Sequence, residues 1–388
     1  MKSEWEKCEF QKLYCMPSRN GLSKPSKIRG NGYKMINMGE LFANDRIYDI
    51  PMELVPVNDK EKESSQVFPC DLLFARQSLV ASGAGKCSIV VETSPLTVFE
   101  SHLIRVRLNP AVADPFFYYY YFKSDRSPIK TIVQHSVQAG IKASDLAKLA
   151  VDCPPLATQK RIAQVLCTFD DKIELNNRIN ENMVNQIQAI YNNEYDPATY
   201  SPNGVLSDIC AYSKVKIAVS ELSLSSYYST ENMLPNKVGA VDAANLPSVS
   251  QTTKCHKGDV LISNIRPYFK KIVYVTEECG CSTDVLCFTP KGDYSQFLFS
   301  ALYADRFFDY MVAGAKGTKM PRGDKQQIMN YPLVIPPMKS LAKFNGVVTP
   351  MLEKIEFNRK ENKRLETIRD TLLPKLMSGE LDLSEVGI

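Results

Sequence analysis

The chain has 388 residues, which suggests two or three domains, and its 44% hydrophobic and 23% charged residues are ordinary for a globular protein. The formal net charge of +4 allows nucleic acid as a partner but does not require it. There is no apolar run long enough for a membrane span, and the opening MKSEWEKCEFQ lacks the apolar core of a signal peptide. We therefore expect a cytoplasmic protein without a membrane partner.

The eleven cysteines form no CxxC pair, and without an export signal we expect them to be reduced thiols. Cys279 and Cys281 form a CxC, and Cys255 precedes His256. The chain has only three histidines, however, and no four-ligand spacing. We therefore predict no metal site.

Residues 1–153 form a first globular part that contains three loops suited to binding DNA. The segment 18–32, SRNGLSKPSKIRGNG, is basic and broken by glycine and proline. The segments 75–86 and 135–142 also carry Arg, Lys, Gln and Ser, which suit base edges and phosphates. The candidate DNA-binding residues in this part are Arg19, Asn20, Lys24, Lys27, Arg76, Gln77, Ser78, Lys86, Gln138 and Lys142.

Tyr118-Tyr119-Tyr120-Tyr121-Phe122 is a second conspicuous stretch of the first part. A row of bases would stack on aromatic residues spaced with period two on a sheet, whereas these five are consecutive. We interpret them as the core and flank of a helix.

Residues 154–196 are predicted to form a long helix that begins after Pro154-Pro155. Apolar residues and two asparagines recur in steps of four and three, which is typical of a coiled-coil seam. The seam positions are Ile162, Leu166, Phe169, Ile173, Asn176 and Asn180.

Residues 197–335 form a second globular part that repeats features of the first. DVLI, from Asp259, resembles DLLF, from Asp71. The segments 263–272 and 314–325 stand where 75–86 and 135–142 stand in the first part, with different side chains. The candidate DNA-binding residues here are Asn264, Arg266, Tyr268, Lys270, Lys271, Lys316, Lys319 and Arg322.

Residues 336–388 contain a second helix, which repeats the first in its KIE-x-N passage after Pro336-Pro337. Its seam positions are Phe344, Val348, Met351, Ile355, Asn358 and Asn362. An amphipathic helix lying on its own domain would show a similar pattern. The shared register and the recurring asparagines favour pairing of the two helices.

The repeat predicts a pseudo-two-fold arrangement if the helices are antiparallel. A helix over 156–194 would be roughly 55–60 Å long at 1.5 Å per residue. That length limits the separation of the two globular parts to about sixteen base pairs. Two similar domains on a rigid spacer suit a DNA site with two parts.

Four stretches approach enzyme motifs without completing them, so we predict no catalytic residue. Gly83-Ala84-Gly85-Lys86 lacks the outer residues of a phosphate loop, and Asp114-Pro115-Phe116-Phe117 lacks the second proline of an amino-methyltransferase motif. Asp152 with Asp170-Asp171 only faintly suggests a metal nuclease, and His135-Ser136 lacks a nucleophile elbow.

The helix passage PPLATQKRIAQVLCTFDDKIELNNRINENM, from Pro154, resembles the central spacer of the specificity (S) subunit of type I restriction–modification systems. LLPKLMSGELD, from Leu372, resembles the usual ending of that family. The order of domain, helix, domain and helix fits the whole chain. The second spacer departs from the family at Leu341-Ala342-Lys343, where the first has Gln159-Lys160-Arg161.

The resemblance implies two mixed α/β target recognition domains joined by two long antiparallel helices. Each domain would read one half of a gapped DNA site, and the helices would set the gap and dock two modification (M) subunits. The chain itself would bind no cofactor. S-adenosylmethionine, ATP and Mg²⁺ would belong to the M subunits and to the restriction (R) subunits.

Two other functions remain open at this point. One is a DNA methyltransferase in its own right, and the other is a coiled-coil scaffold that does not read sequence.

Overall fold

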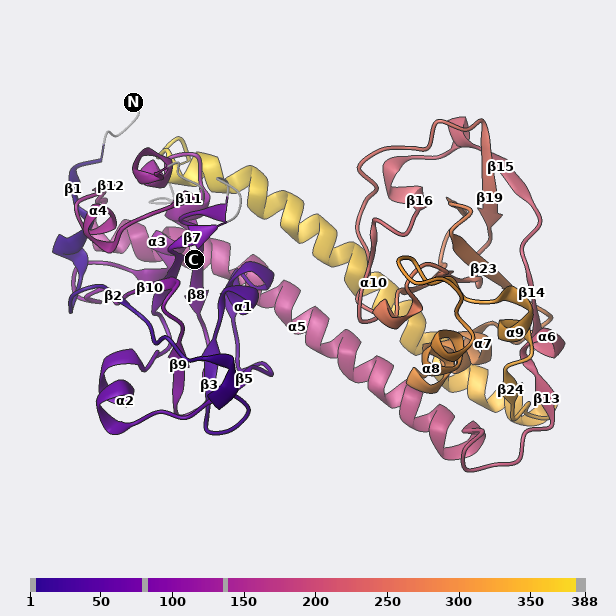
Figure 1. Ribbon diagram of the computed structural model, residues 1–388. Helices are drawn as coiled ribbons and strands as arrows, with labels where there is room; N and C mark the ends of the chain where they lie inside the picture. Colours follow the sequence, from indigo (N-terminus) through magenta and orange to yellow (C-terminus); the bar gives the residue numbers. More distant parts are fainter. Residues whose placement is uncertain (1–4, 79–82, 135–138, 382–388) are drawn as a thin grey trace. The chain divides into compact units, whose positions relative to one another are not determined.

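The structure is a computed structural model that describes residues 5–78, 83–134 and 139–381. The chain divides into two compact units. Unit 1 comprises Met1–Glu174 with Asn362–Ile388, and unit 2 comprises Leu175–Glu361. The helices α5 (Leu156–Tyr195) and α10 (Met338–Met377), magenta and yellow in Figure 1, each contribute residues to both units.

Unit 1 is built around a five-stranded sheet with the order β2-β10-β6-β8-β4. Its strands are β2 (Arg19–Asn20), β10 (Leu103–Val106), β6 (Leu72–Ala75), β8 (Cys87–Val90) and β4 (Arg46–Ile47). The central strand β6 is antiparallel to both neighbours, and all four of its residues are buried. Such a continuous apolar run is typical of a strand covered on both faces.

The helix α3 (Pro115–Lys123) packs against this sheet and shares its core. Asp114 caps the helix by accepting a hydrogen bond from the Phe117 amide, and Pro115 occupies the first turn, where its missing N–H costs nothing. The aromatic run is buried from Phe117 to Phe122. The predicted core helix is therefore confirmed.

A smaller three-stranded sheet, with the order β5-β3-β9, completes unit 1 together with short helices and turns. These elements are β3 (Tyr33–Ile36), β5 (Glu53–Val55), β9 (Thr97–Phe99), α1 (Met38–Ala43), α2 (Asp59–Ser65), α4 (Ala143–Ala147), η1 (Phe10–Leu13), η2 (Ser26–Ile28) and η4 (Pro128–Ile132). Two strand pairs join β1 (Lys7–Glu9) to β12 (Ala150–Asp152) and β7 (Gln77–Ser78) to β11 (Ala139–Gly140).

The β1–β12 pair brings Cys8 and Cys153 together, and their sulfurs form a disulfide. The expectation that all cysteines are reduced is therefore wrong at this pair. Cys8 lies opposite Val151 in the strand pair. Cys153, two residues after Val151, therefore lies diagonally across the pair, within reach of the Cys8 side chain. The two cysteines are 145 residues apart in sequence, and their spacing alone did not indicate the contact.

Unit 2 contains a four-stranded sheet with the order β14-β23-β20-β21. Its strands are β14 (Cys210–Tyr212), β23 (Val285–Pro290), β20 (Val260–Ser263) and β21 (Ile272–Tyr274). The order reproduces β2-β10-β6-β8 of unit 1, again with antiparallel neighbours around a buried central strand. The predicted internal repeat of a mixed α/β domain is thereby confirmed.

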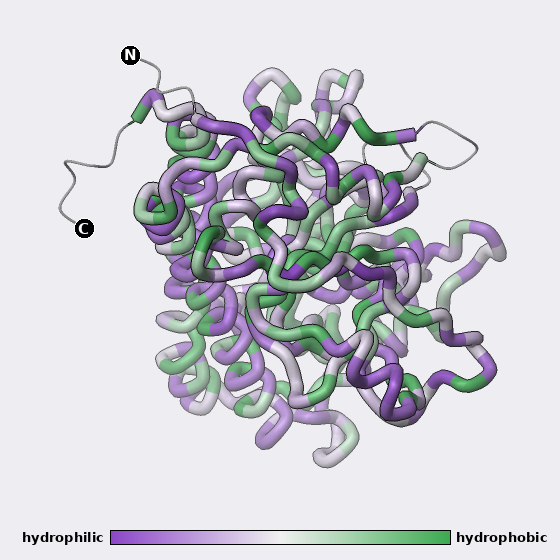
Figure 2. Tube along the Cα trace, turned by 90° about the vertical axis from the view of Figure 1, so that its left-hand side faces the viewer, coloured by the Kyte–Doolittle hydropathy of each residue, from purple (hydrophilic) through white to green (hydrophobic). Residues whose placement is uncertain are grey.

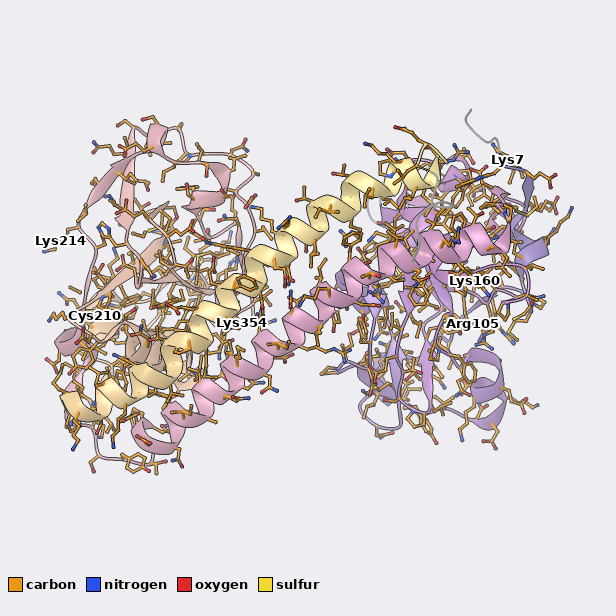
Figure 3. All side chains as sticks on the ribbon, turned by 180° about the vertical axis from the view of Figure 1, so that it is seen from behind. Lys7, Arg105, Lys160, Cys210, Lys214 and Lys354 are labelled. Carbon is orange, nitrogen blue, oxygen red and sulfur yellow. A yellow bond between two sulfur atoms is a disulfide. The ribbon has the colours of Figure 1, made fainter. Side chains whose placement is uncertain are left out.

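The remaining elements of unit 2 include a second four-stranded sheet with the order β15-β19-β22-β16. The elements are β13 (Gly204–Val205), α6 (Leu206–Ile209), β15 (Lys216–Ala218), η5 (Val219–Glu221), η6 (Leu224–Ser226), β16 (Tyr227–Tyr228), β17 (Met233–Leu234), β18 (Gly239–Ala240), β19 (Gln251–Cys255), η7 (Pro267–Phe269), β22 (Cys279–Cys281), α7 (Ser295–Tyr303), α8 (Asp305–Ala313), α9 (Lys325–Met329) and β24 (Pro332–Leu333). Cys210 of β14 is buried within this unit and is labelled in Figure 3.

Four cysteines of unit 2 lie in one buried apolar cluster: Cys255, Cys279, Cys281 and Cys287. Cys255 and Cys279 face each other across the β19–β22 pair. Within the described ranges, no group of three or more His, Cys, Asp or Glu side chains is arranged to hold a metal ion.

The long helices are antiparallel in both units. In unit 1, Ile162 and Leu166 of α5 share a core with Leu376 and Met377 of α10. In unit 2, residues from the end of α5 share a core with residues from the start of α10, among them Tyr191 and Phe344. Hydrophobic and hydrophilic residues alternate along the helical coils in Figure 2, as amphipathic helices require. No helix in the described part of the chain could span a membrane.

The seam positions of the two helices are all covered to some degree. Eight are buried, namely Ile162, Leu166, Asn176, Phe344, Val348, Ile355, Asn358 and Asn362. Four are half-buried, namely Phe169, Ile173, Asn180 and Met351. In contrast, Lys160 on α5 and Lys354 on α10, both labelled in Figure 3, are exposed.

Candidate nucleic-acid interface

The central strand of each unit leads into a loop that pairs with a later segment of the same unit. In unit 1 this loop follows β6, and its β7 pairs with β11 just before α4. In unit 2 the loop follows β20, and Ile265 forms a bridge with Arg322 just before α9. Both units therefore present a pair of loops at the same place in the fold, with different sequences.

The loop pair of unit 2 is held by backbone hydrogen bonds. The Arg266 amide donates to the Pro321 carbonyl at 2.8 Å, and the Gly323 amide donates to the Asn264 carbonyl at 3.2 Å. Lys316 and Arg322 exchange two backbone hydrogen bonds of 2.9 Å, which close a short hairpin around residues 317–321. The exposed side chains of this hairpin and of residues 266–269 thus lie on one firmly bonded framework.

A third segment of unit 2, which the sequence did not suggest, joins this loop pair. The amides of Asn236 and Lys237 donate to the carbonyls of Phe269 and Lys270 at 2.8 and 2.9 Å. Asn236 and Lys237 have φ of 56° and 63°, which is left-handed backbone and is typical of a tight hairpin turn before glycine. The Asn-Lys-Val-Gly passage was the signal that could have revealed it.

Several candidate cations of unit 2 are held by acidic or carbonyl partners. Lys270 and Lys237 both bind Asp305, and their hydrogen bonds hold the pKa of Asp305 below its usual value. Lys271 donates to the Thr230 carbonyl at 2.5 Å, and burial lowers its pKa. Lys316 pairs with Asp324 and Arg322 with Asp284. These side chains organise the loops.

Other candidates of unit 2 point outward. The side chains of Arg266, Tyr268 and Lys319 are exposed, whereas Asn264 is only 8% exposed. The Asn264 side-chain carbonyl is buried and accepts no hydrogen bond. Asn264 therefore lies beneath the loops, whereas Arg266, Tyr268 and Lys319 are accessible, as are the ion-paired Lys316 and Arg322.

In unit 1 the basic segment 18–32 and the loop after β6 meet at the turn 99–102. The Leu22 amide donates to Phe99, the Ser101 amide donates to Leu22, and the Arg76 amide donates to His102, all at 2.8–2.9 Å. Gly21 permits this approach, because a Cβ there would lie 2.0 Å from the Phe99 carbonyl oxygen. Because β7 of the loop after β6 also pairs with β11, the structure brings all three predicted loops of unit 1 together.

The candidate DNA-binding residues of unit 1 likewise divide into those held by partners and those that are exposed. Lys24 pairs with Glu61 and Lys86 with Asp45. Arg76, Gln77 and Ser78 are half-buried. Arg19, Asn20, Lys27 and Lys142 are exposed. Gln138 lies outside the described residues, as do 79–82 of the loop after β6.

The carboxylates of the incomplete enzyme motifs bind neighbouring groups of the fold. Asp114 caps α3. Asp152 binds Arg126, and Asp170 accepts a hydrogen bond from Tyr120 and pairs with Arg369. His135 and Ser136 lie outside the described residues. These contacts give Asp114, Asp152 and Asp170 structural roles in the fold.

Comparison with known proteins agrees with this architecture. Residues 3–184 match the family model described as the type I restriction modification DNA specificity domain. The prediction that the chain resembles specificity subunits of type I restriction–modification systems is thereby confirmed.

Individual relatives extend the similarity beyond the first unit. The chain is 25% identical over 343 residues to the type I restriction enzyme MjaIX specificity subunit of Methanocaldococcus jannaschii, covering 79% of this chain and 78% of that protein. It is 26% identical over 155 residues to the HindI specificity subunit of Haemophilus influenzae, covering 38% and 34%. A crystal structure of a type I restriction–modification S subunit from M. genitalium shares the fold, with a TM-score of 0.55, 18% identity and 96% of both chains covered.

Proposed function

We propose that the two units each bind one half of a bipartite, gapped DNA site and that the chain is the non-catalytic recognition subunit of a methyltransferase or endonuclease complex. The observation that carries the proposal is the repeated loop pair after the central strand. The two copies share strand order and bridging position but differ in their exposed side chains. A repeated framework with different side chains suits two half-sites of different sequence.

The exposed cations supply the chemistry of DNA contact in this proposal. Arg266 and Lys319 in unit 2, and Arg19 and Lys27 in unit 1, are exposed. Arginine can bind guanine through two hydrogen bonds, and lysine can neutralise a phosphate. The half-buried cations Lys270 and Lys271 hold the loops in position through Asp305 and the Thr230 carbonyl.

The two long helices would set the gap between the half-sites and dock two M subunits. A continuous helix rises 1.5 Å per residue, so its length limits the spacing of the sequences read at its two ends. The S-adenosylmethionine, ATP and Mg²⁺ needed for methylation and cleavage would be held by the M and R subunits. Because its substrate would be cellular DNA, we expect the complex to work in the cytoplasm.

Methyl transfer from labelled S-adenosylmethionine tests this division of labour. The proposal predicts transfer to DNA by this chain together with its M subunit and none by this chain alone. Transfer by the isolated chain would make it a methyltransferase in its own right. Equal binding of the complex to all duplexes, without a preferred sequence, would leave only the scaffold function.

A further inference from the structure

An exposed aromatic pair stands at the tip of the loop between β20 and β21. Tyr268 is 50% exposed and Phe269 is 38% exposed. Their ring centroids are 4.8 Å apart, and the ring planes are tilted by 57°. Two large rings left partly in water contribute little to folding, and an exposed apolar patch is typical of a binding site.

The backbone beneath the two rings is fixed in an uncommon conformation. Both aromatic residues belong to the 3₁₀ turn η7. This turn is flanked by Arg266, which has a φ of 50°, and by Lys270, which has a φ of 51°. Non-glycine residues with positive φ are strained, and such strain is concentrated at functional sites. The strain here holds the two rings outward.

Hydrogen bonds and ion pairs maintain this conformation. The Arg266 amide is bound to Pro321, and the Phe269 and Lys270 carbonyls accept from Asn236 and Lys237. Asp305 binds Lys270 at 2.6 Å. The tip is therefore preorganised, so inserting its rings into a partner would cost little ordering.

The surroundings of the tip combine apolar and cationic side chains. Met320, next to Pro321, is 50% exposed, and Val238, in the neighbouring turn, is 65% exposed. Arg266 and Lys319 are exposed beside them. Apolar wedges flanked by cations are the means by which proteins separate stacked base pairs while binding the phosphates on either side.

We propose that Tyr268 inserts between neighbouring base pairs of the half-site bound by unit 2, with Phe269 supporting its ring from the side. This rests on the proposed function. The tilt between the rings allows only one of them to lie parallel to the bases, and Tyr268 is the more exposed. Phe269 also has the Lys271 ammonium over its ring, 5.9 Å from the ring centroid.

Insertion of Tyr268, the wedge of this proposal, also affects which base sequence unit 2 prefers. Unstacking costs least at pyrimidine–purine steps, because these steps are the most easily kinked. Unit 2 would therefore favour such a step beneath Tyr268 without a hydrogen bond to either base. This is a source of sequence preference additional to Arg266 and the other polar side chains of the loops.

The test uses the complex of this chain with its M subunits and a duplex bearing the motif that this complex methylates. 2-Aminopurine, whose fluorescence rises on unstacking, replaces one base at a time in each half-site. We expect a rise at one step of the unit 2 half-site. Tyr268→Ala should abolish the rise and weaken binding about tenfold, in line with the loss of one base–aromatic stack. Tyr268→Phe should retain both the signal and the affinity.

Tyr200→Ala is the matched control, because Tyr200 is also an exposed tyrosine of unit 2, at 41%, and belongs to the segment after α5 and not to the loops. It should leave fluorescence and affinity unchanged. If the wild-type complex discriminates between sequences but shows no rise, and Tyr268→Ala binds as tightly, the wedge is wrong while the proposed function stands. If Tyr268→Ala instead prevents assembly with the M subunits, the tip is a protein-docking surface. If the wild-type complex does not discriminate between sequences, both proposals fail.

Discussion

The carboxyl groups of Asp71 and Asp259 occupy equivalent places, immediately before the central strands β6 and β20. Both are almost fully buried, at 0% and 1% exposure. Asp71 is held by two hydrogen bonds from Arg107, of 2.6 and 2.7 Å. Asp259 instead has the Cys287 thiol 3.2 Å away and accepts from the His256 amide. Burial, with Cys287 close by, raises the pKa of Asp259 to about 7.

This raised pKa makes the stability of unit 2 depend on pH. In the unfolded chain the Asp259 carboxyl ionises near pH 4, whereas in the folded chain it stays protonated until about pH 7. Below pH 4 the carboxyl is protonated in both states, so its burial costs no unfolding free energy. The cost grows between pH 4 and 7, where only the unfolded chain ionises readily, and is complete above pH 7. We predict that Asp259→Asn unfolds at a higher temperature than the wild type at pH 8 and at the same temperature at pH 4.

The repeat provides a control with the opposite sign for this prediction. Asp71→Asn removes a carboxylate that is paired with Arg107, so it should destabilise the chain by about 2–4 kcal/mol at pH 8. Thermal unfolding of Asp259→Asn and Asp71→Asn across the pH range checks both predictions. An Asp259→Asn variant that is destabilised at pH 8 would show that the ionised carboxylate is needed in unit 2.

Arg266 is the exposed cation most suited to direct base contact. We predict that Arg266→Ala lowers discrimination at the half-site of unit 2 by roughly tenfold, since an arginine–guanine pair contributes about 1–3 kcal/mol. Arg19→Ala should affect only the other half-site. Competition binding with duplexes altered in one half at a time checks both variants. A change at both half-sites for either variant would disprove the assignment.

At the scale of elements, the asparagines of the helix seam make different contacts. Asn176 donates to the Glu361 carboxylate at 2.7 Å, and Asn358 donates to the Asn180 side chain at 2.8 Å. The Asn358 side-chain carbonyl is buried without a hydrogen bond. A buried, unsatisfied acceptor is destabilising, so its removal should stabilise the pair.

We therefore predict that Asn358→Leu raises the unfolding temperature of unit 2 by a few degrees, since 1 kcal/mol shifts Tm by about 2–4 °C for a domain of this size. Asn176→Leu should raise it less, because Glu361 loses a donor. A buried asparagine specifies the register of paired helices, so the variant with both Asn176→Leu and Asn358→Leu should pair in additional registers. Cysteine crosslinking along the seam detects these registers. An unchanged Tm with a single register would mean that these residues do not control pairing.

The ion pair between Asp170 of α5 and Arg369 of α10 is a further contact between the helices. Asp170 is 7% exposed and also accepts a hydrogen bond from Tyr120 at 2.5 Å. We predict that Arg369→Met costs about 3 kcal/mol of unfolding free energy, because it leaves a buried carboxylate without its cation. Denaturant unfolding measures this cost.

Two further variants complete this experiment. Arg364→Met, at an exposed position of the same helix, should be neutral. Adding Asp170→Asn to Arg369→Met should restore much of the loss, because it removes the uncompensated charge. A double variant as unstable as the single one would show that Arg369 acts through packing alone.

The long helices and the repeat could be predicted from the sequence because a period of 3.5 residues persists over many turns. The loops were placed correctly in the order of elements, but which cations remain exposed depends on distant partners such as Asp305 for Lys270. Phe269 was missed because a single apolar residue in a loop carries no periodic signal. The strained backbone at Arg266 and Lys270 is set by tertiary hydrogen bonds, which no local pattern encodes.

At the level of the whole molecule, a single chain contains two versions of one unit. The sheets share their order, while the exposed residues of the loops differ. An S subunit with this organisation would specify two unlike sequences and the distance between them. Replacing residues 197–335 by the corresponding part of a relative should then alter one half of the recognised site and preserve the other.

Methylome sequencing shows whether this chain specifies a DNA site of two unlike parts. Cells expressing this chain with its M subunit are compared with cells that express the M subunit alone. We predict a new methylated motif of two short sequences separated by a fixed number of unspecified base pairs. A methylated motif that is continuous, or one that appears without this chain, would contradict the account.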